Sequence, residues 1–170
     1  MSETVIVLQE SSVLIGKGKS GQTPKLQETR KIPMEGYGNL IEQWDNVLIN
    51  YQKSHKGEQI RLVLPAGYSS VRVSRIPYAT GKQLNQMAEK VLEEGFRDGI
   101  ADYGIIDVDK KDGICLCCGG AEKDAMEHIR NICKENGLQI SGITVPMEGY
   151  LRLLKQKKEY QGKTAVFLFF

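Results

Sequence analysis

IRLVLPAGYSSVRVSRIPYATGKQLNQMAEKVLEEG, residues 60–95, contains the junction around which the rest of the chain is organised. Its first part, Ile60–Leu64, is a short apolar run that Pro65 ends, a pattern typical of a buried strand. Its second part, Ser70–Ile76, alternates apolar and polar side chains and predicts another strand. Pro77 ends that strand, because proline has no N–H to donate to a neighbour.

The alternation in the second strand predicts which of its faces is buried. Val71 and Val73 share one face, which we expect to pack in the core. Arg72 and Ser74 share the other face, which we expect to lie away from the core.

A helix is expected directly after these strands. Thr80 and Gln83 have the spacing of a capping box, which predicts that the helix begins there. An apolar stripe then recurs with helical spacing at Leu84, Met87, Ala88, Val91 and Leu92. The junction therefore consists of strand, strand and helix.

The remaining elements follow from the same patterns. Further strands are expected at residues 4–8, 13–17, 25–32, 103–108, 114–118, 138–145 and 164–170. Further helices are expected after Asn39, at residues 121–136 and from Pro146. Residues 96–102 are expected to be loop, and Gly119 and Gly120 to end a strand. Because the last predicted strand is wholly apolar, we expect the sequence to continue in a longer protein.

Composition excludes several classes of protein. The 170 residues suit one domain or two small subdomains that share a core. With 23 basic and 21 acidic residues, the formal net charge is +2, which is too balanced to indicate nucleic-acid binding, despite the basic run at 155–158. No apolar run approaches the roughly 20 residues of a membrane-spanning helix. The expected location is the cytoplasm, and recruitment to the inner face of the membrane would require a partner.

No motif predicts a metal site or catalytic residues. The cysteines at 115, 117, 118 and 133 lack zinc-binding spacing and are expected to be small buried hydrophobes. Residues 16–20 lack the first glycine of a phosphate-binding loop, and residues 107–113 lack the ligands of a calcium loop. Neither His55 nor His128 belongs to a recognisable catalytic constellation.

Several soft patterns together resemble a known family. They are the strand ending in Pro65, the strand at 70–77, the helix at 82–90, the helix–Gly–Leu–strand step over 125–145, the helix at 146–154 and the strand at 163–169. This series resembles the first half of the cytoplasmic actin-like platform proteins of type IV pili, the PilM family, and their relatives in type II secretion and cell division.

The resemblance implies an α/β fold of the actin-like, ribonuclease-H-like type. Residues 1–67 and 138–170 would form the core subdomain, and residues 68–137 would form a small inserted α/β subdomain. Proteins of this family bind ATP between two halves, and their first phosphate loop has an Asp followed by Gly in the opening hairpin. Here residues 5–13 read VIVLQESSV, without either residue. We therefore expect no nucleotide cofactor and no enzymatic activity; the alternative is a degenerate actin-like nucleotide-binding enzyme.

The resemblance also implies a protein partner. Members of the family bind the short cytoplasmic tail of an inner-membrane assembly protein, near the joint between the core and the inserted subdomain. The residues expected to form that site here are Pro65, Tyr68, Arg72, Ile76, Pro77 and Tyr78. The expected function is therefore that of a noncatalytic scaffold or adaptor in a pilus or secretion-like envelope machine. In the alternative interpretation of the second strand, Arg72 and Arg75 only keep a sheet edge soluble.

Overall fold

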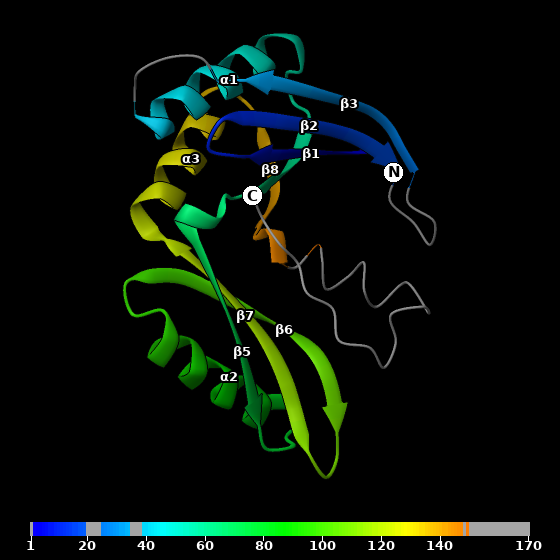
Figure 1. Cartoon of the computed structure of the whole chain (residues 1–170), viewed down its shortest axis with the longest axis vertical. Coiled ribbons are helices and arrows are strands. Elements are labelled where there is room, and N and C mark those ends of the chain that lie inside the picture. Colours follow the sequence, from blue (N-terminus) through cyan, green and yellow to red (C-terminus); the bar gives the residue numbers. More distant parts are fainter. Residues whose placement is uncertain (1, 20–24, 35–38, 148, 150–170) are drawn as a thin grey trace.

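The structure, a computed structural model, describes residues 2–19, 25–34, 39–147 and 149 of the chain (Figure 1). In chain order its elements are β1 (Ser2–Leu8), β2 (Ser12–Lys19), β3 (Lys25–Pro33), α1 (Leu40–Ser54), β4 (Gln59–Val63), the short 3₁₀ turn η1 (Ala66–Tyr68), β5 (Ser69–Ile76), α2 (Gly81–Gly95), β6 (Gly99–Asp109), β7 (Gly113–Glu122), α3 (Lys123–Glu135) and β8 (Gln139–Thr144). The described strands form a five-stranded sheet of order β3-β2-β1-β4-β8 and a three-stranded sheet of order β5-β7-β6.

The five-stranded sheet has an antiparallel half and a parallel half. β2 pairs antiparallel with β1 and with β3, as expected of a strand that returns through a tight turn. β4 pairs parallel with β1 and with β8, because the chain returns to the sheet through crossovers that contain helices. Leu62 of β4 therefore lies between Ile6 and Ile143. The prediction that the strands near residues 5–8, 60–64 and 140–145 share one sheet is confirmed.

Helices α1 and α3 cover one face of this sheet (Figure 1). α1 begins at Asn39, whose side-chain oxygen accepts a hydrogen bond from the backbone N–H of Ile41 at 3.1 Å. Trp44 and Leu48, one helical turn apart, are fully buried in the core. Helix α3 contributes Ile129 and Cys133 to the same core, which also takes in the apolar residues of β1, β2 and β4.

Helix α2 covers one face of the three-stranded sheet. Ala88 of α2 is fully buried against the β7 side chains Ile114, Leu116 and Cys118. The rest of the predicted apolar stripe of α2 packs around Ala88, so that prediction is confirmed. Figure 1 shows this second layer extending away from the five-stranded sheet, with β5, β6 and β7 leading to its far end.

Two predictions about β6 and β7 are wrong. β6 begins at Gly99, within the stretch expected to be loop, and β7 continues through Gly119 and Gly120 to Glu122. The two strands pair along this whole length, so the glycines do not interrupt the ladder. Residue 120 must be glycine, because a Cβ atom at this position would clash with the ring of Phe96.

The capping box at the start of α2 is also not formed as predicted. Thr80 does occupy the N-cap position with extended backbone, but its side chain makes no capping hydrogen bond. Gly81 follows with a φ of 56°, a left-handed conformation that favours glycine. The backbone therefore turns at Gly81, directly after the N-cap residue Thr80, whose side chain would otherwise cap the helix.

The packing of α3 bears on where the inserted subdomain ends. β5, α2, β6 and β7 form the second layer, whereas α3 packs with the five-stranded sheet. The division at residue 137 therefore stays a proposal, and the position of α3 favours an end near Glu122 instead. A helix begins at Pro146, as predicted, but its remainder and the strand predicted at 164–170 lie outside the described residues. Within the described part of the chain, no helix is long and apolar enough to cross a membrane.

Candidate functional site

The six residues predicted to bind a partner are distributed along β5 and the segments on either side of it. Pro65 and Tyr68 lie where the two sheets meet, and the Tyr68 ring makes an edge-to-face contact with Trp44 at 5.0 Å between centroids. Ile76 is buried beneath α2 at the opposite end of β5, followed by the exposed residues Pro77 and Tyr78. A β-strand of eight residues spans about 25 Å, so only an extended segment could contact both groups, and their role as one binding site stays a prediction.

The prediction for the two faces of β5 is wrong, because the face expected to lie in the core is the one that points away from α2. Arg72 lies opposite Cys118, whose side chain is buried under α2, and its guanidinium reaches Gly95 at the end of that helix. Val73 lies opposite Cys117 on the other face and is 59% exposed. The positive charge of Arg72 at the C-terminal end of α2 is favourable for the helix dipole, which gives this residue a structural role.

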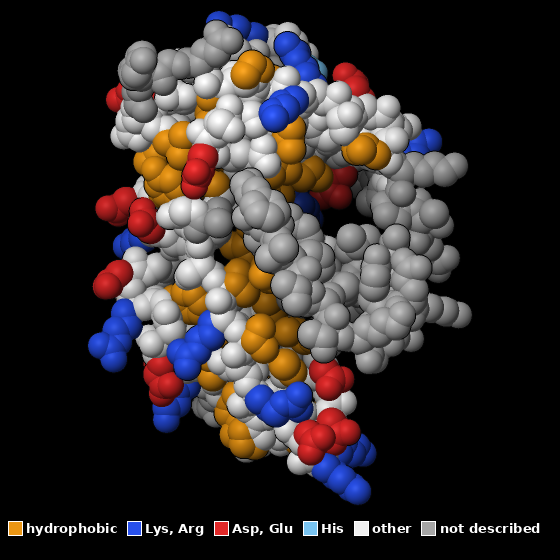
Figure 2. Space-filling model, viewed as in Figure 1, with side chains coloured by type: hydrophobic (Ala, Val, Ile, Leu, Met, Phe, Trp, Pro, Cys, Tyr) orange, Lys and Arg blue, Asp and Glu red, His pale blue; other side chains and the backbone are white. Residues whose placement is uncertain are grey.

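A cavity of about 370 Å³ lies at the joint between the two sheets. One wall comes from the face of β6 and β7 opposite α2, and the other from the ends of β4 and β8 with one residue of α3. The main lining side chains are Leu64, Ile100, Ile106, Cys117, Met126, Ile143 and Val145. Figure 2 shows hydrophobic side chains running down the centre of this face of the molecule.

Local irregularities of the strands shape the cavity. A bulge in β6 leaves Ile106 without an opposite residue in β7 and allows its side chain to line the cavity. A side chain at Gly119 would crowd Val145, which is 3.2 Å from the position of a Cβ atom there. Gly104, by contrast, has open space in front of it, because a Cβ atom would meet nothing within 4 Å. Gly119 thus allows Val145 to pack closely against β7, and Gly104 leaves open space on β6.

A smaller cavity of about 290 Å³ lies at one end of the three-stranded sheet, between the start of β5, the segment from α2 to β6 and the end of β7. Tyr68, Ser70 and Arg97 contribute its polar groups, and Phe96 its main apolar surface. Of the predicted partner residues, Tyr68 lines this second cavity, and Arg72 is adjacent to Gly95 in its wall.

The turn at the position of a phosphate loop is occupied by its own side chains. The Ser12 hydroxyl donates to the side-chain oxygen of Gln9 at 2.8 Å, and the Trp44 ring N–H donates to the carbonyl oxygen of Gln9 at 3.3 Å. The carboxylate of Glu10 extends toward Gly67. A carboxylate at this turn would repel phosphate, and the turn has no glycine that would allow a phosphate to approach the backbone closely.

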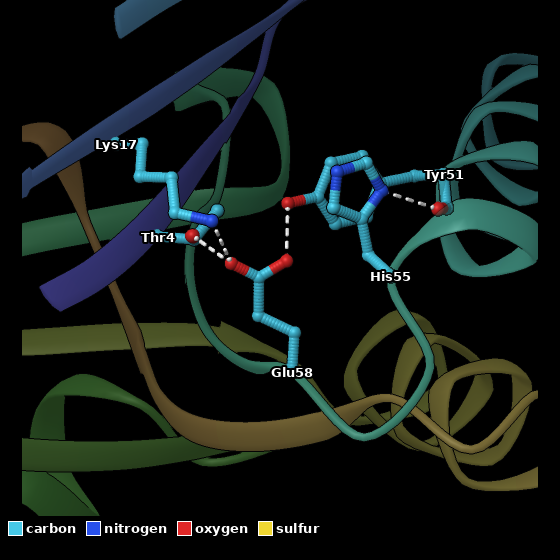
Figure 3. Close-up of polar contacts among 5 residues, drawn as sticks. All are labelled: Thr4, Lys17, Tyr51, His55 and Glu58. Carbon is cyan, nitrogen blue, oxygen red and sulfur yellow. Dashed lines mark hydrogen bonds and ion pairs between the residues drawn. The ribbon is translucent and has the colours of Figure 1, made fainter. Parts of the chain in front are cut away.

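Among the described residues, the side chains around Glu58 form a connected polar cluster (Figure 3). One carboxylate oxygen accepts hydrogen bonds from Thr4 Oγ1 at 2.7 Å and Lys17 Nζ at 2.9 Å, and the other from Tyr51 Oη at 2.8 Å. The Tyr51 ring stacks on His55, with centroids 4.0 Å apart. The cluster joins the end of α1 to β1 and β2.

The electrostatics of this cluster indicate a structural role. Burial disfavours the charged form of Glu58, but the three hydrogen bonds and the charge of Lys17 outweigh it and lower its pKa to about 2. Burial and the bond to Glu58 raise the pKa of Tyr51 to about 12. A carboxylate with a pKa this low is a weak base, so the cluster is unsuited to proton transfer near neutral pH.

The histidines lie at the end of α1 and on α3, and the cysteines lie on β7 and α3. His128 Nε2 lies 2.7 Å from Asp45 Oδ2, a contact that links α3 to α1. Cys118 and Cys133 are buried, and Cys115 and Cys117 are half-buried on the face of β7 opposite α2. Among the described residues, no three His, Cys, Asp or Glu side chains lie close enough to hold a metal ion.

The sequence did not identify the main cavity. Its β6 wall begins in a stretch that was expected to be loop, and its other wall comes from residues about 40 positions away in sequence. One local signal was available: residues 98–109 contain four aspartates and neither lysine nor arginine. Asp102 lines the cavity.

Comparison with known proteins gives matches in structure only. No family model and no curated protein matches the sequence. Among solved structures, the chain is similar to one described as the PilM–PilN type IV pilus biogenesis complex, with a TM-score of 0.68 and 12% identity over 91% of this chain and 50% of that one. It is also similar to the cytoplasmic domain of EpsL, an inner-membrane component of the type II secretion system of Vibrio cholerae, with a TM-score of 0.56 and 12% identity over 85% of this chain and 57% of that one.

These matches establish the fold. The chain has the actin-like fold, with a small α/β subdomain inserted in the core, as the sequence predicted. It spans about half the length of the solved structures that it matches.

Proposed function

We propose that this chain is a noncatalytic scaffold or adaptor module of a type IV pilus or secretion-like envelope machine, located on the cytoplasmic side of the inner membrane. In this proposal it binds the cytoplasmic tail of a membrane partner. The observation that carries the proposal is the apolar cavity between the two sheets. The fold supports it, because similar structures come from a pilus biogenesis complex and from an inner-membrane component of a secretion system.

The cavity suits an extended segment better than a globular surface. Its volume of about 370 Å³ is at the small end of the range for ligand pockets, so it accommodates only a few side chains. One of its walls includes β6, an edge strand of the three-stranded sheet, and at such an edge a peptide can combine main-chain hydrogen bonds with apolar anchors. Leu64, Met126 and Ile143 would provide the apolar contacts for such anchors.

The noncatalytic part of the proposal rests on two groups. The opening hairpin carries Glu10, and nothing in its turn is suited to bind phosphate. The other prominent carboxylate, Glu58, accepts hydrogen bonds from Thr4, Lys17 and Tyr51, which hold it ionised and make it a weak base. The alternative, a degenerate nucleotide-binding enzyme, requires measurable ATP binding.

The test is a binding titration with a substitution that fills the cavity. The ligand is a synthetic peptide that corresponds to the cytoplasmic tail of a membrane protein encoded beside this chain. Gly104→Phe is a suitable variant, because residue 104 has open space in front of it and does not need a positive φ. We expect affinity for the tail to fall at least tenfold, or about 1.4 kcal/mol.

Two further variants locate the site. Gln86→Phe adds the same ring at an exposed position on α2 and should leave binding unchanged. The double variant Tyr68→Ala with Arg72→Ala tests the second cavity. Loss of binding in the double variant alone would move the site there, and full binding by all variants would refute docking at the joint. Circular dichroism of each variant checks that its fold is retained.

A further inference from the structure

The wall that β6 contributes to the main cavity is acidic. Of the described residues that line the cavity, Asp102 alone has a charged side chain. It lies opposite Gly119 of β7, which has no side chain to cover it. Asp107 follows on the same strand opposite Cys115, and alternation along β7 places Cys115 on the same face as the cavity residue Cys117.

Asp102 has capacity for a further interaction. One of its carboxylate oxygens accepts a hydrogen bond from the backbone N–H of Tyr103 at 2.7 Å. Of the lysines and arginines in the described part of the chain, none forms an ion pair with it. The side chain is exposed, and the cavity beside it is lined mostly by apolar and uncharged residues. A cation placed there by a bound peptide would meet a carboxylate that has no ion-pair partner among the described residues, at the edge of a cavity where solvent screens an ion pair less than in open water.

We propose that Asp102 is the specificity-determining residue of the cavity and selects a lysine or arginine next to the apolar anchor of the bound segment. This inference rests on the proposed function, because it concerns the same site. It agrees with the chemistry of the proposed partner: cytoplasmic segments near a membrane helix carry an excess of lysine and arginine. A tail with both an apolar anchor and a basic residue matches both parts of the cavity.

The experiment selects binders from a phage-displayed library of random peptides of about twelve residues, long enough to cross the joint as an extended chain. The target is the full 170-residue chain. Phages that also bind Gly104→Phe are removed, so that only cavity-dependent peptides remain. We expect lysine or arginine beside the apolar anchor to be enriched at least threefold over the starting library. The same selection against Asp102→Asn should show no enrichment.

A matched control separates a local effect from a change in net charge. Asp112→Asn removes one negative charge at the β6–β7 turn, outside the cavity lining, and should leave the enrichment intact. Cavity-dependent peptides without basic enrichment would overturn the role of Asp102 and leave the proposed function standing. If no cavity-dependent peptide emerges, docking at the cavity is refuted and the inference falls with it.

Discussion

Replacing Glu58 with glutamine removes the charge at the centre of the polar cluster while nearly preserving the shape of the side chain. In the native protein, hydrogen bonds from Thr4, Lys17 and Tyr51 hold this carboxylate ionised. Its pKa is lowered from 4.5 to about 2, so ionised Glu58 favours the folded state over the unfolded state.

The magnitude follows from this difference in pKa. Each pKa unit corresponds to about 1.4 kcal/mol, so a lowering from 4.5 to about 2 has an upper limit of roughly 3 kcal/mol. The side chains of Glu58 and Lys17 are 21% and 40% exposed, and solvent therefore screens part of the interaction. We expect Glu58→Gln to lower the free energy of unfolding by about 1–2 kcal/mol near neutral pH.

The sign of the pH dependence is fixed by the direction of the shift. Because the folded-state pKa lies below the unfolded value, the stabilisation is complete above pH 4.5 and is lost as the pH falls toward 2. The stability difference between native protein and Glu58→Gln should therefore shrink to less than half of its neutral value at about pH 3. Urea denaturation followed by circular dichroism, repeated from about pH 7 down to pH 3, measures it.

The control is Glu127→Gln. Glu127 is 54% exposed and lies 3.9 Å from Lys123, so its loss should change the free energy of unfolding by at most about 0.5 kcal/mol at any pH in the series. A stability difference for Glu58→Gln that stays constant from about pH 7 to pH 3 would refute the reasoning, because the hydrogen bonds would then not act on the ionisation of Glu58.

Three further predictions concern other parts of the molecule. In native protein, a thiol reagent should modify Cys115 and Cys117 quickly and Cys118 and Cys133 slowly. Burial raises the pKa of the Cys118 and Cys133 thiols, and burial together with the charge of Asp45 raises that of Cys133 to about 11. Equal rates for all four thiols would contradict this prediction. Gly113→Ala should lower the free energy of unfolding by about 2–4 kcal/mol in urea denaturation, because residue 113 has a φ of 92° and a Cβ atom there would clash with the carbonyl of Ile76. Gly104→Ala is the control: a Cβ atom at residue 104 meets nothing within 4 Å, so the free energy of unfolding should fall by less than about 1 kcal/mol. Calorimetry with ATP and Mg²⁺ should show no binding to the chain, and a dissociation constant on the order of micromolar, about −8 kcal/mol, would revive the enzyme alternative.

The sequence by itself determined most of the secondary structure. Hydrophobic periodicity located α1, α2 and α3, and the two strands around Pro65 were predicted within a residue or two. These signals are local, because burial of one helical stripe or one strand face leaves a trace in neighbouring residues. The actin-like fold was predicted from the resemblance of this series of elements to the PilM family, and the similar solved structures confirm it.

The tertiary structure alone decided which face of β5 is covered. The alternation of Val71, Arg72 and Val73 predicted the wrong face, because β5 is the edge of a narrow sheet. α2 packs on the central strand β7, where Ile114 and Leu116 face it, and β5 must follow the register that β7 imposes. Arg72 can lie on the face that α2 covers, because its long side chain extends past the sheet to the C-terminal end of α2.

The candidate site likewise exists only in three dimensions. The main cavity forms because β8 ends beside β7, with Val145 packed in front of Gly119, and residues 64, 102 and 143 become neighbours only through that contact. Long-range contacts of this kind leave no periodic signal in the sequence, since the side chains that line a cavity do not repeat along any one element. The sequence could show that β6 is acidic; that Asp102 lies beside an apolar cavity followed only from how the two sheets meet.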